Sequence, residues 1–181
     1  GASRPWLEVG VGGGRFAHAL SAEAGLDPAP FPLRLARDRG IQVVQGRGED
    51  LPFAPGVFGA VLLVMTLCFV DDGMAVLREA RRVLRTDGGL VLGMVLAEGS
   101  WGRRYRELAA RGHDYYRAAH FFTRPELAAL LDAAGFRLVR VRSALLRPPD
   151  AMPVRGDVHE GDVLTAGYTA MFCNASQPGI P

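Results

Sequence analysis

The chain has 181 residues, a formal net charge of +2, 49% apolar residues and 22% charged residues. This composition can build one domain with a buried core, and it excludes an intrinsically disordered chain. The basic residues are all arginines, which excludes chemistry that needs a lysine amine, such as Schiff-base formation or a complete Walker A loop. The cysteines Cys68 and Cys173 lie far apart and fit no metal-binding spacing, and no apolar run approaches the ~20 residues of a membrane span. We therefore expect a cytoplasmic protein with reduced cysteines, no metal and no membrane segment.

Short apolar runs alternate with helical patterns along the chain. In chain order we expect a strand at 6–9, a helix at 16–24, strands at 41–44 and 58–65, a helix at 72–85, a strand at 90–97, a helix at 123–134, and strands at 136–141 and 165–173. Nearly continuous apolar runs such as 58–65 are typical of strands buried on both faces of a parallel sheet. The alternation predicts an α/β domain that binds ligands at the carboxyl ends of its strands.

Residues 99–122 interrupt this alternation directly after a strand, and we expect them to form a cap over the binding crevice within a single domain of residues 1–181. Tyr115, Tyr116 and Phe121 are candidates for a substrate pocket, although packing of the cap on the sheet would explain them as well. His113 and His120 are the candidate general bases if the substrate must lose a proton. The cap arginines could bind nucleic acid or an acidic substrate, but the nearly balanced charge favours a solvated helix face.

The most informative stretch is residues 7–16, where an apolar strand runs into glycines and a helix follows. Glycines let the backbone turn sharply and approach a ligand closely. A dinucleotide loop requires G-x-G-x-x-G, but the sixth position counted from Gly10 is Arg15. The observed pattern is Glu-x-Gly-x-Gly-x-Gly, with Glu8 two residues before the first glycine. This pattern resembles motif I of the class I S-adenosylmethionine (SAM)-dependent methyltransferases.

The resemblance continues in further segments, which are 25–28 (Gly-Leu-Asp-Pro), 46–53 (Gly-Arg-Gly-Glu-Asp-Leu-Pro-Phe), 58–72, and 79–89 (Glu-Ala-Arg-Arg-Val-Leu-Arg-Thr-Asp-Gly-Gly). The similar subgroup is the small-molecule methyltransferases related to quinone biosynthesis (methyltransferase type 11). The resemblance implies a Rossmann-like, mostly parallel sheet of seven strands with helices on both faces, and SAM as the cofactor. The cofactor-binding residues that it implies are Glu8, Gly10, Gly12, Gly14, Asp27, Pro28, Gly48, Glu49, Met65 and Thr66.

Two departures from the family pattern keep alternatives open. Arg47 stands where the family usually has an Asp that faces the adenine amine, and Gly59 also replaces an Asp. These departures leave a non-catalytic SAM-binding protein open as an alternative to methyl transfer to a small molecule. An NAD(P)-dependent oxidoreductase on a similar fold, which the glycine spacing disfavours, and an RNA methyltransferase that uses the cap arginines are further alternatives. The pattern identifies neither the acceptor nor the oligomeric state. Because the chain opens almost directly on a strand, we expect further residues before Gly1 in the complete protein.

Overall fold

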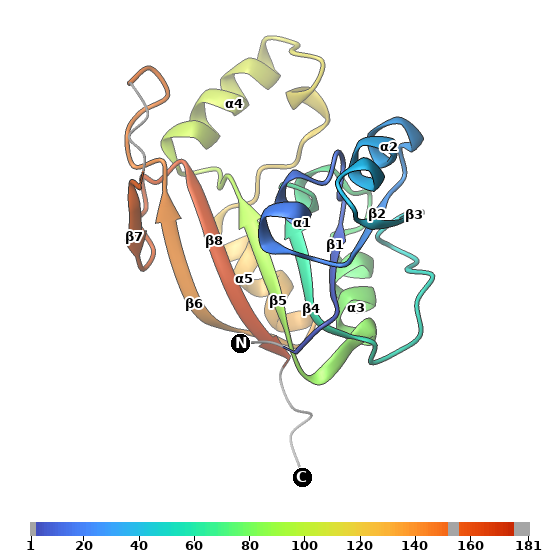
Figure 1. The fold of residues 1–181 in the computed structure, drawn as a ribbon. Helices are drawn as coiled ribbons and strands as arrows, with labels where there is room; N and C mark the ends of the chain where they lie inside the picture. The colour runs from blue at the N-terminus through green and yellow to red at the C-terminus, as the bar shows by residue number, and fades with distance from the viewer. Residues whose placement is uncertain (1–2, 152–155, 176–181) are drawn as a thin grey trace.

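The computed structural model describes residues 3–151 and 156–175, which build one mixed sheet with helices on both faces (Figure 1). The strands are β1 (Trp6–Val9), β2 (Ala24–Asp27), β3 (Gln42–Gln45), β4 (Phe58–Val64), β5 (Leu84–Met94), β6 (Phe136–Ala144), β7 (Val158–Glu160) and β8 (Tyr168–Ala175). The helices are α1 (Arg15–Leu20), α2 (Pro30–Asp38), α3 (Gly73–Val83), α4 (Ser100–Ala110) and α5 (Arg124–Ala133), with the short 3₁₀ helices η1 (Leu67–Phe69) and η2 (Tyr116–Ala118). This arrangement confirms the predicted α/β class.

The sheet has the strand order β3-β2-β1-β4-β5-β8-β6-β7. The first five strands pair in parallel, and β8 runs antiparallel between β5 and β6. Because the order reverses direction at β1, the loops after β1 and β4 diverge to opposite faces and leave a crevice at the carboxyl ends of these strands. The glycine loop follows β1, so this topology brings it to that crevice.

The core consists of two layers of side chains, one on each face of the sheet. In β4 every residue is buried, with Val61 and Leu63 facing one layer and Leu62 the other. The helices α3 and α5 cover the first face, through Leu77 and Leu127 among others, and α1 and α2 lie on the opposite face (Figure 1). Burial on both faces explains why this strand has no alternation of apolar and polar residues.

The sequence prediction of seven strands differs by one, because the described residues form eight. The additional strand, β7, pairs antiparallel with the end of β6 and lies in the Pro/Gly-rich stretch 147–162, between the strands expected at 136–141 and 165–173, where the sequence predicts a loop. Three residues are too few to display a period of two, so the pattern gave no signal for it. Part of that stretch, 152–155, lies outside the described residues.

Two predicted helix ends also differ from the structure. The first helix ends at Leu20, where Ser21 takes a left-handed conformation (φ 57°), and Ala24 already belongs to β2. The helix expected to reach Arg85 ends at Val83, because Leu84 is extended and pairs with Phe58. In both cases strand pairing overrides the local helical pattern.

The predicted cap segment forms α4 and η2, which lie beyond the carboxyl end of β5 and away from the two helix layers (Figure 1). Its α4 packs chiefly on η2, where the rings of Tyr105 and Tyr116 stack with centroids 4.3 Å apart. Within residues 3–151 and 156–175, no helix has the length and hydropathy that crossing a membrane requires.

Candidate functional site

A cavity of about 610 Å³ opens at the carboxyl ends of β1, β2 and β4. Of the residues predicted to bind the cofactor, all but Gly14 line it: Glu8, Gly10, Gly12, Asp27, Pro28, Gly48, Glu49, Met65 and Thr66. These residues come from four separate segments of the chain, and the fold brings the four segments together at one cavity.

The glycine loop shapes one wall of the cavity. Gly10 has a φ of 74°, and a Cβ added to it would lie 2.3 Å from Oγ1 of Thr66, which donates a hydrogen bond to the Val9 carbonyl at 2.9 Å. Gly14 has a φ of 75°, and its Cβ would lie 2.9 Å from Cα of Ala36 in α2. Gly10 therefore allows the loop to approach the end of β4, whereas Gly14 allows it to pack on α2, outside the cavity lining.

Asp27 lies at the end of β2 with its carboxylate at the cavity. Its Oδ2 accepts a hydrogen bond from the Gly12 amide and its Oδ1 accepts one from the Ala29 amide, each at 2.9 Å. A carboxylate has about four acceptor sites, so each oxygen can still accept a second hydrogen bond. The two amides fix the orientation of a group that could receive both hydroxyls of a vicinal diol.

Glu8 is a buried acid in the cavity wall, with a residue exposure of 1%. The Ala17 amide donates a hydrogen bond to its carboxylate, while Oε2 has no hydrogen-bond partner among the described residues. Burial raises the pKa of Glu8 to about 7, because desolvation penalises the charged form, and the Ala17 hydrogen bond offsets only part of this effect. A buried carboxylate without a counter-charge would be stabilised by a cationic ligand group.

Arg47, the main departure from the family pattern, lies on the cavity rim. Its guanidinium donates to the carboxylates of Asp71 and Glu49. Glu49 Oε1 also accepts a hydrogen bond from the Asp71 amide at 3.1 Å. These contacts link the loop after β3 to the loop after η1, and they place the predicted cofactor residue Glu49 in an ion pair at the rim.

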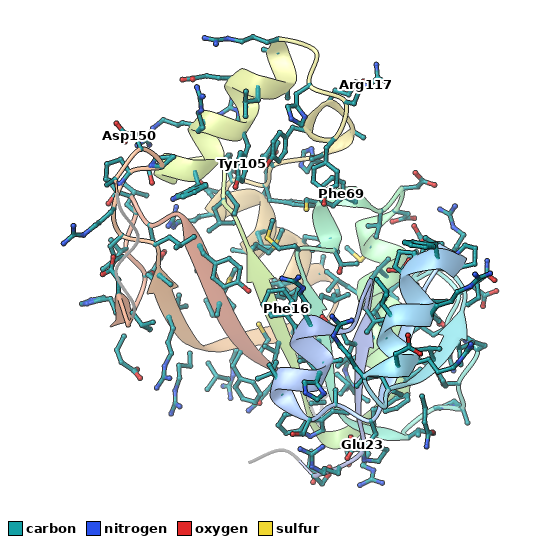
Figure 2. The ribbon with its side chains drawn as sticks, turned by 45° about the horizontal axis from the view of Figure 1, so that its top comes forward. Phe16, Glu23, Phe69, Tyr105, Arg117 and Asp150 are labelled. Carbon is teal, nitrogen blue, oxygen red and sulfur yellow. The ribbon has the colours of Figure 1, made fainter. Side chains whose placement is uncertain are left out.

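Aromatic side chains line another part of the cavity. Tyr115 from the cap lies with its ring centroid 4.7 Å from that of Phe69. Phe16 from α1 lines the same cavity, and Figure 2 labels both phenylalanines. Met65, directly after β4, also lines the cavity and has a φ of 56°. The sequence analysis missed Phe16 and Phe69 because no spacing marks them as ligand contacts, although they lie within the motif segments 7–16 and 58–72.

The other predicted substrate residues and bases lie outside the cavity lining. Tyr116 and Phe121 pack against Tyr105 within the cap. His113 Nδ1 accepts from the Tyr115 amide at 3.3 Å, and the His120 ring packs on Phe122 at 4.3 Å. The structure therefore brings Tyr115 alone of these five candidates to the cavity.

Three further sequence observations concern metals, the buried thiol and the cap arginines. The described residues contain no group of three or more His, Cys, Asp or Glu side chains suited to a metal ion. Cys68 is buried, and burial raises the pKa of its thiol to about 11, so it is a poor nucleophile. The cap arginines do not line the cavity, and Arg104 and Arg117 pair with acids on the cap itself.

The fold and the site together define a class of protein: a Rossmann-like α/β domain in which the glycine loop, Asp27 at the end of β2 and the buried Glu8 converge on one cavity. Residues 7–92 match the model of the methyltransferase domain family. A SAM-dependent methyltransferase of Thermotoga maritima, described as a possible histamine N-methyltransferase, superposes with a TM-score of 0.87 at 34% identity, covering 95% of this chain and 82% of that one. The chain therefore belongs to the SAM-dependent methyltransferases.

Two curated relatives extend this comparison. An uncharacterized protein of Mycobacterium tuberculosis is 44% identical over 93% of this chain, and the match spans 60% of that relative's length. The demethylmenaquinone methyltransferase of Tropheryma whipplei is 32% identical over 70% of this chain and 52% of its own length. The similarity to the second relative agrees with the quinone-related subgroup that the motifs resemble.

Proposed function

We propose that this chain binds SAM in the cavity and transfers its methyl group to a small-molecule acceptor at the aromatic end, within one domain in which residues 99–122 form the acceptor-side cap. The observation that carries the proposal is the convergence on one cavity of about 610 Å³ of Asp27, the glycine loop and Glu8, whose Oε2 has no hydrogen-bond partner among the described residues. A SAM molecule requires contacts for a ribose diol, a flexible amino-acid chain and an ammonium group, and these residues match those requirements in number and chemistry.

When bound, the cofactor would supply a methyl group on a sulfonium that is already activated for displacement. Asp27 would accept hydrogen bonds from the ribose hydroxyls, and Gly48 and Glu49 would contact the adenine side. Gly10 and Gly12 would let the backbone pass the methionine portion without side-chain interference. Glu8, with Met65 and Thr66 opposite it, would hold the ammonium group.

The residues of the chain have mainly to align the acceptor and exclude water, because an in-line displacement from a sulfonium needs no strong base. This requirement is consistent with the placement of His113 and His120 outside the cavity lining. The aromatic end favours a ring-bearing or otherwise apolar acceptor over a nucleic acid, since Phe16, Phe69 and Tyr115 line it and the cap arginines do not. The names of the Thermotoga and Tropheryma relatives, which mention histamine and demethylmenaquinone, also point to ring-bearing acceptors.

We place the protein in the cytoplasm as part of the same proposal. Cys68 and Cys173 are both free and buried, which is typical of a reducing compartment.

No feature of the cavity favours an oxidoreductase or a non-catalytic role.

The test is calorimetry with S-adenosylhomocysteine (SAH), the product form of the cofactor, on protein whose folding is checked by thermal unfolding. We expect SAH to bind, and Asp27→Asn to weaken binding by about 10- to 100-fold, since it removes charge-assisted hydrogen bonds of about 1.5–3 kcal/mol. Asp38→Asn is the matched control, because Asp38 is exposed at the end of α2 and does not line the cavity. A folded wild-type chain that does not bind SAH would refute the proposal, as would equal affinity of the Asp27 and Asp38 variants.

A further inference from the structure

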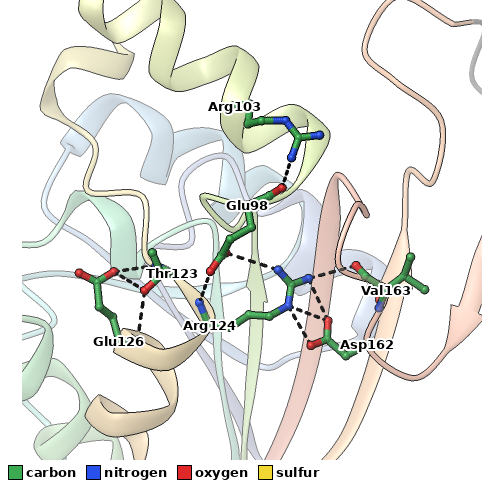
Figure 3. A network of polar contacts seen from close by, with 8 residues as sticks. Glu98, Arg103, Thr123, Arg124, Glu126, Asp162 and Val163 are labelled. Carbon is green, nitrogen blue, oxygen red and sulfur yellow. Dashed lines mark hydrogen bonds and ion pairs between the residues drawn. The ribbon is translucent and has the colours of Figure 1, made fainter.

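The base of the cap is held by a charged network centred on Arg124, the first residue of α5 (Figure 3). Its Nε and Nη2 donate to the Asp162 carboxylate at 2.8–3.0 Å, and Nη2 also donates to the Val163 carbonyl at 3.0 Å. Its Nη1 lies 3.4 Å from Glu98 Oε2, and its backbone amide donates to Glu98 Oε1 at 3.0 Å. One side chain thus connects the segment after β5, the start of α5 and the segment before β8.

The network lies where the cap leaves and rejoins the rest of the fold. The Ala97 amide donates to the Phe122 carbonyl at 2.9 Å, so the two ends of the cap lie side by side. The side chain of Arg124 is 18% exposed, compared with 66% for Arg117 in the exposed cap pair with Asp114. A bidentate, partly buried Arg–carboxylate pair holds geometry far better than an exposed pair, which contributes about 0–1 kcal/mol.

A continuous chain of contacts leads from this base to the cavity. Arg103, in the first turn of α4, donates to the backbone carbonyl of Glu98 (Figure 3). Two residues further along α4, the Tyr105 ring stacks on Tyr116, and Tyr116 follows Tyr115 in the chain. The position of α4 above the sheet therefore determines where Tyr115 lies.

Tyr115 is the point at which the cap reaches the site. Of residues 99–122, all of which the structure describes, Tyr115 alone lines the cavity, with its ring 4.7 Å from Phe69. Besides that contact, the cap has two attachments to the rest of the fold within the described residues. One is its base, and the other is the hydrogen bond that the His120 amide donates to the Cys68 carbonyl at 2.8 Å. A small rotation about the base would displace Tyr115 from the aromatic end.

We infer that Arg124 is a positioning residue for the reaction: it touches neither cofactor nor acceptor, but its contacts with Glu98 and Asp162 hold the cap so that Tyr115 forms one wall of the acceptor site. The inference rests on the proposed function, because it takes the aromatic end to be the place where the acceptor binds. Lysine cannot replace Arg124, since an ammonium group is a point charge and cannot form the bidentate contact with Asp162 while also reaching Glu98.

The first experiment measures hydrogen exchange in Arg124→Lys and in the control Arg142→Lys. Arg142 also forms an ion pair, with Glu160, but this pair is exposed, joins β6 to β7 and is not part of the Arg124 network. We expect peptides covering 100–119 to exchange at least about 10-fold faster in the Arg124 variant, with β1 and β4 unchanged, because local opening is governed by local contacts. Unchanged exchange in the cap, or an equal increase throughout the sheet, would overturn the inference.

The second experiment reports on Tyr115 directly, by fluorine NMR of protein labelled with 3-fluorotyrosine. The chain has four tyrosines, so Tyr115→Phe identifies the resonance of interest. We expect SAH to shift the Tyr115 resonance in the wild type and in Arg142→Lys, and the shift to be lost in Arg124→Lys although SAH still binds within about 2-fold of wild-type affinity. A purely structural role for Arg124 predicts instead that the shift survives, or that SAH affinity falls together with it.

The two arms separate this inference from the proposed function. If the wild-type chain does not bind SAH, the proposed function is refuted, while the exchange experiment still decides whether Arg124 anchors the cap. If SAH binds and the Tyr115 shift is the same in all variants, the positioning role is refuted and the proposed function stands.

Discussion

The buried acid Glu8 should make the stability of the chain depend on pH in a way that one substitution removes. Burial raises the pKa of Glu8 from its ordinary value of 4.5 to about 7. Between these values the folded chain holds a proton that the unfolded chain releases. The free energy of unfolding should therefore fall as the pH rises through this window and should lose no more from this group above about pH 7.

The magnitude follows from the two pKa values. A difference between 4.5 and about 7 corresponds to about 3 kcal/mol of stability that is present below pH 4.5 and absent above the folded pKa. Glu8→Gln keeps the shape of the side chain and cannot ionise. Its buried amide adds a cost of its own, about 1–3 kcal/mol where a hydrogen bond is missing, but that cost does not change with pH.

The assay is urea unfolding of the wild type and of Glu8→Gln at a series of pH values from about 4.5 to 8.5. The quantity of interest is the difference between the two unfolding free energies, because other titrating groups cancel in it. We expect this difference to move by about 3 kcal/mol in favour of the glutamine variant as the pH rises. Parallel profiles would refute the reasoning, since they would mean that Glu8 ionises as easily in the folded chain as in the unfolded one.

The same acid links pH to the proposed ligand. An ammonium group near Glu8 favours the ionised carboxylate, so SAH binding near pH 6.5 should release about 0.8 of a proton from Glu8. The release should fall towards zero at about pH 8.5 and should be absent in Glu8→Gln. Calorimetry in buffers with different enthalpies of ionisation measures it, and equal proton release by the two proteins would exclude Glu8 as the partner of the ammonium group.

Two further predictions concern single contacts. Gly10→Ala should destabilise the fold by about 2–4 kcal/mol, since the new Cβ would lie 2.3 Å from Thr66 Oγ1 at a positive φ. The control Gly40→Ala should cost only about 1–2 kcal/mol, because Gly40 has a φ of 85° but open space around it. Urea unfolding measures both losses, and equal losses would contradict the packing argument. Thr123→Ala should cost about 1 kcal/mol of unfolding free energy, because it removes the capping box with Glu126 at the start of α5. Thr123→Ser should retain most of that stability. Equal unfolding free energies of the two variants would exclude the capping box as the cause.

Much of the fold is predictable because its signals are local. The apolar run that became β4 and the Thr123–Glu126 spacing that became the capping box each depend on residues a few positions apart. The elements that differ depend on distant partners. The strand β7 exists through its pairing with β6, and α3 ends at Val83 because Leu84 pairs with Phe58, so no window of sequence around either position contains the information.

The candidate site divides in the same way. Glycines and acids at fixed spacings mark the cofactor side, because the backbone turn and the hydrogen bonds there require particular residue types at particular positions. The proposed acceptor side has no such requirement, and tertiary packing alone decides which aromatic rings line it. Tyr115 and Tyr116 are neighbours with similar side chains, yet one lines the cavity and the other stacks on Tyr105 inside the cap. Only the placement of α4 distinguishes them.

Arg47 illustrates how a departure from a family pattern can be compensated by its surroundings. An arginine cannot accept a hydrogen bond from an adenine amine, so in the sequence the substitution reads as a loss. In the structure its guanidinium lies between Glu49 and Asp71, and Glu49 in turn accepts from the Asp71 amide. The single positive charge of Arg47 thereby offsets one of the two negative charges and fixes both carboxylates. In the proposed complex, the backbone around Gly48, which packs tightly against Val9 and Val76, remains as the rigid surface for the adenine of the cofactor.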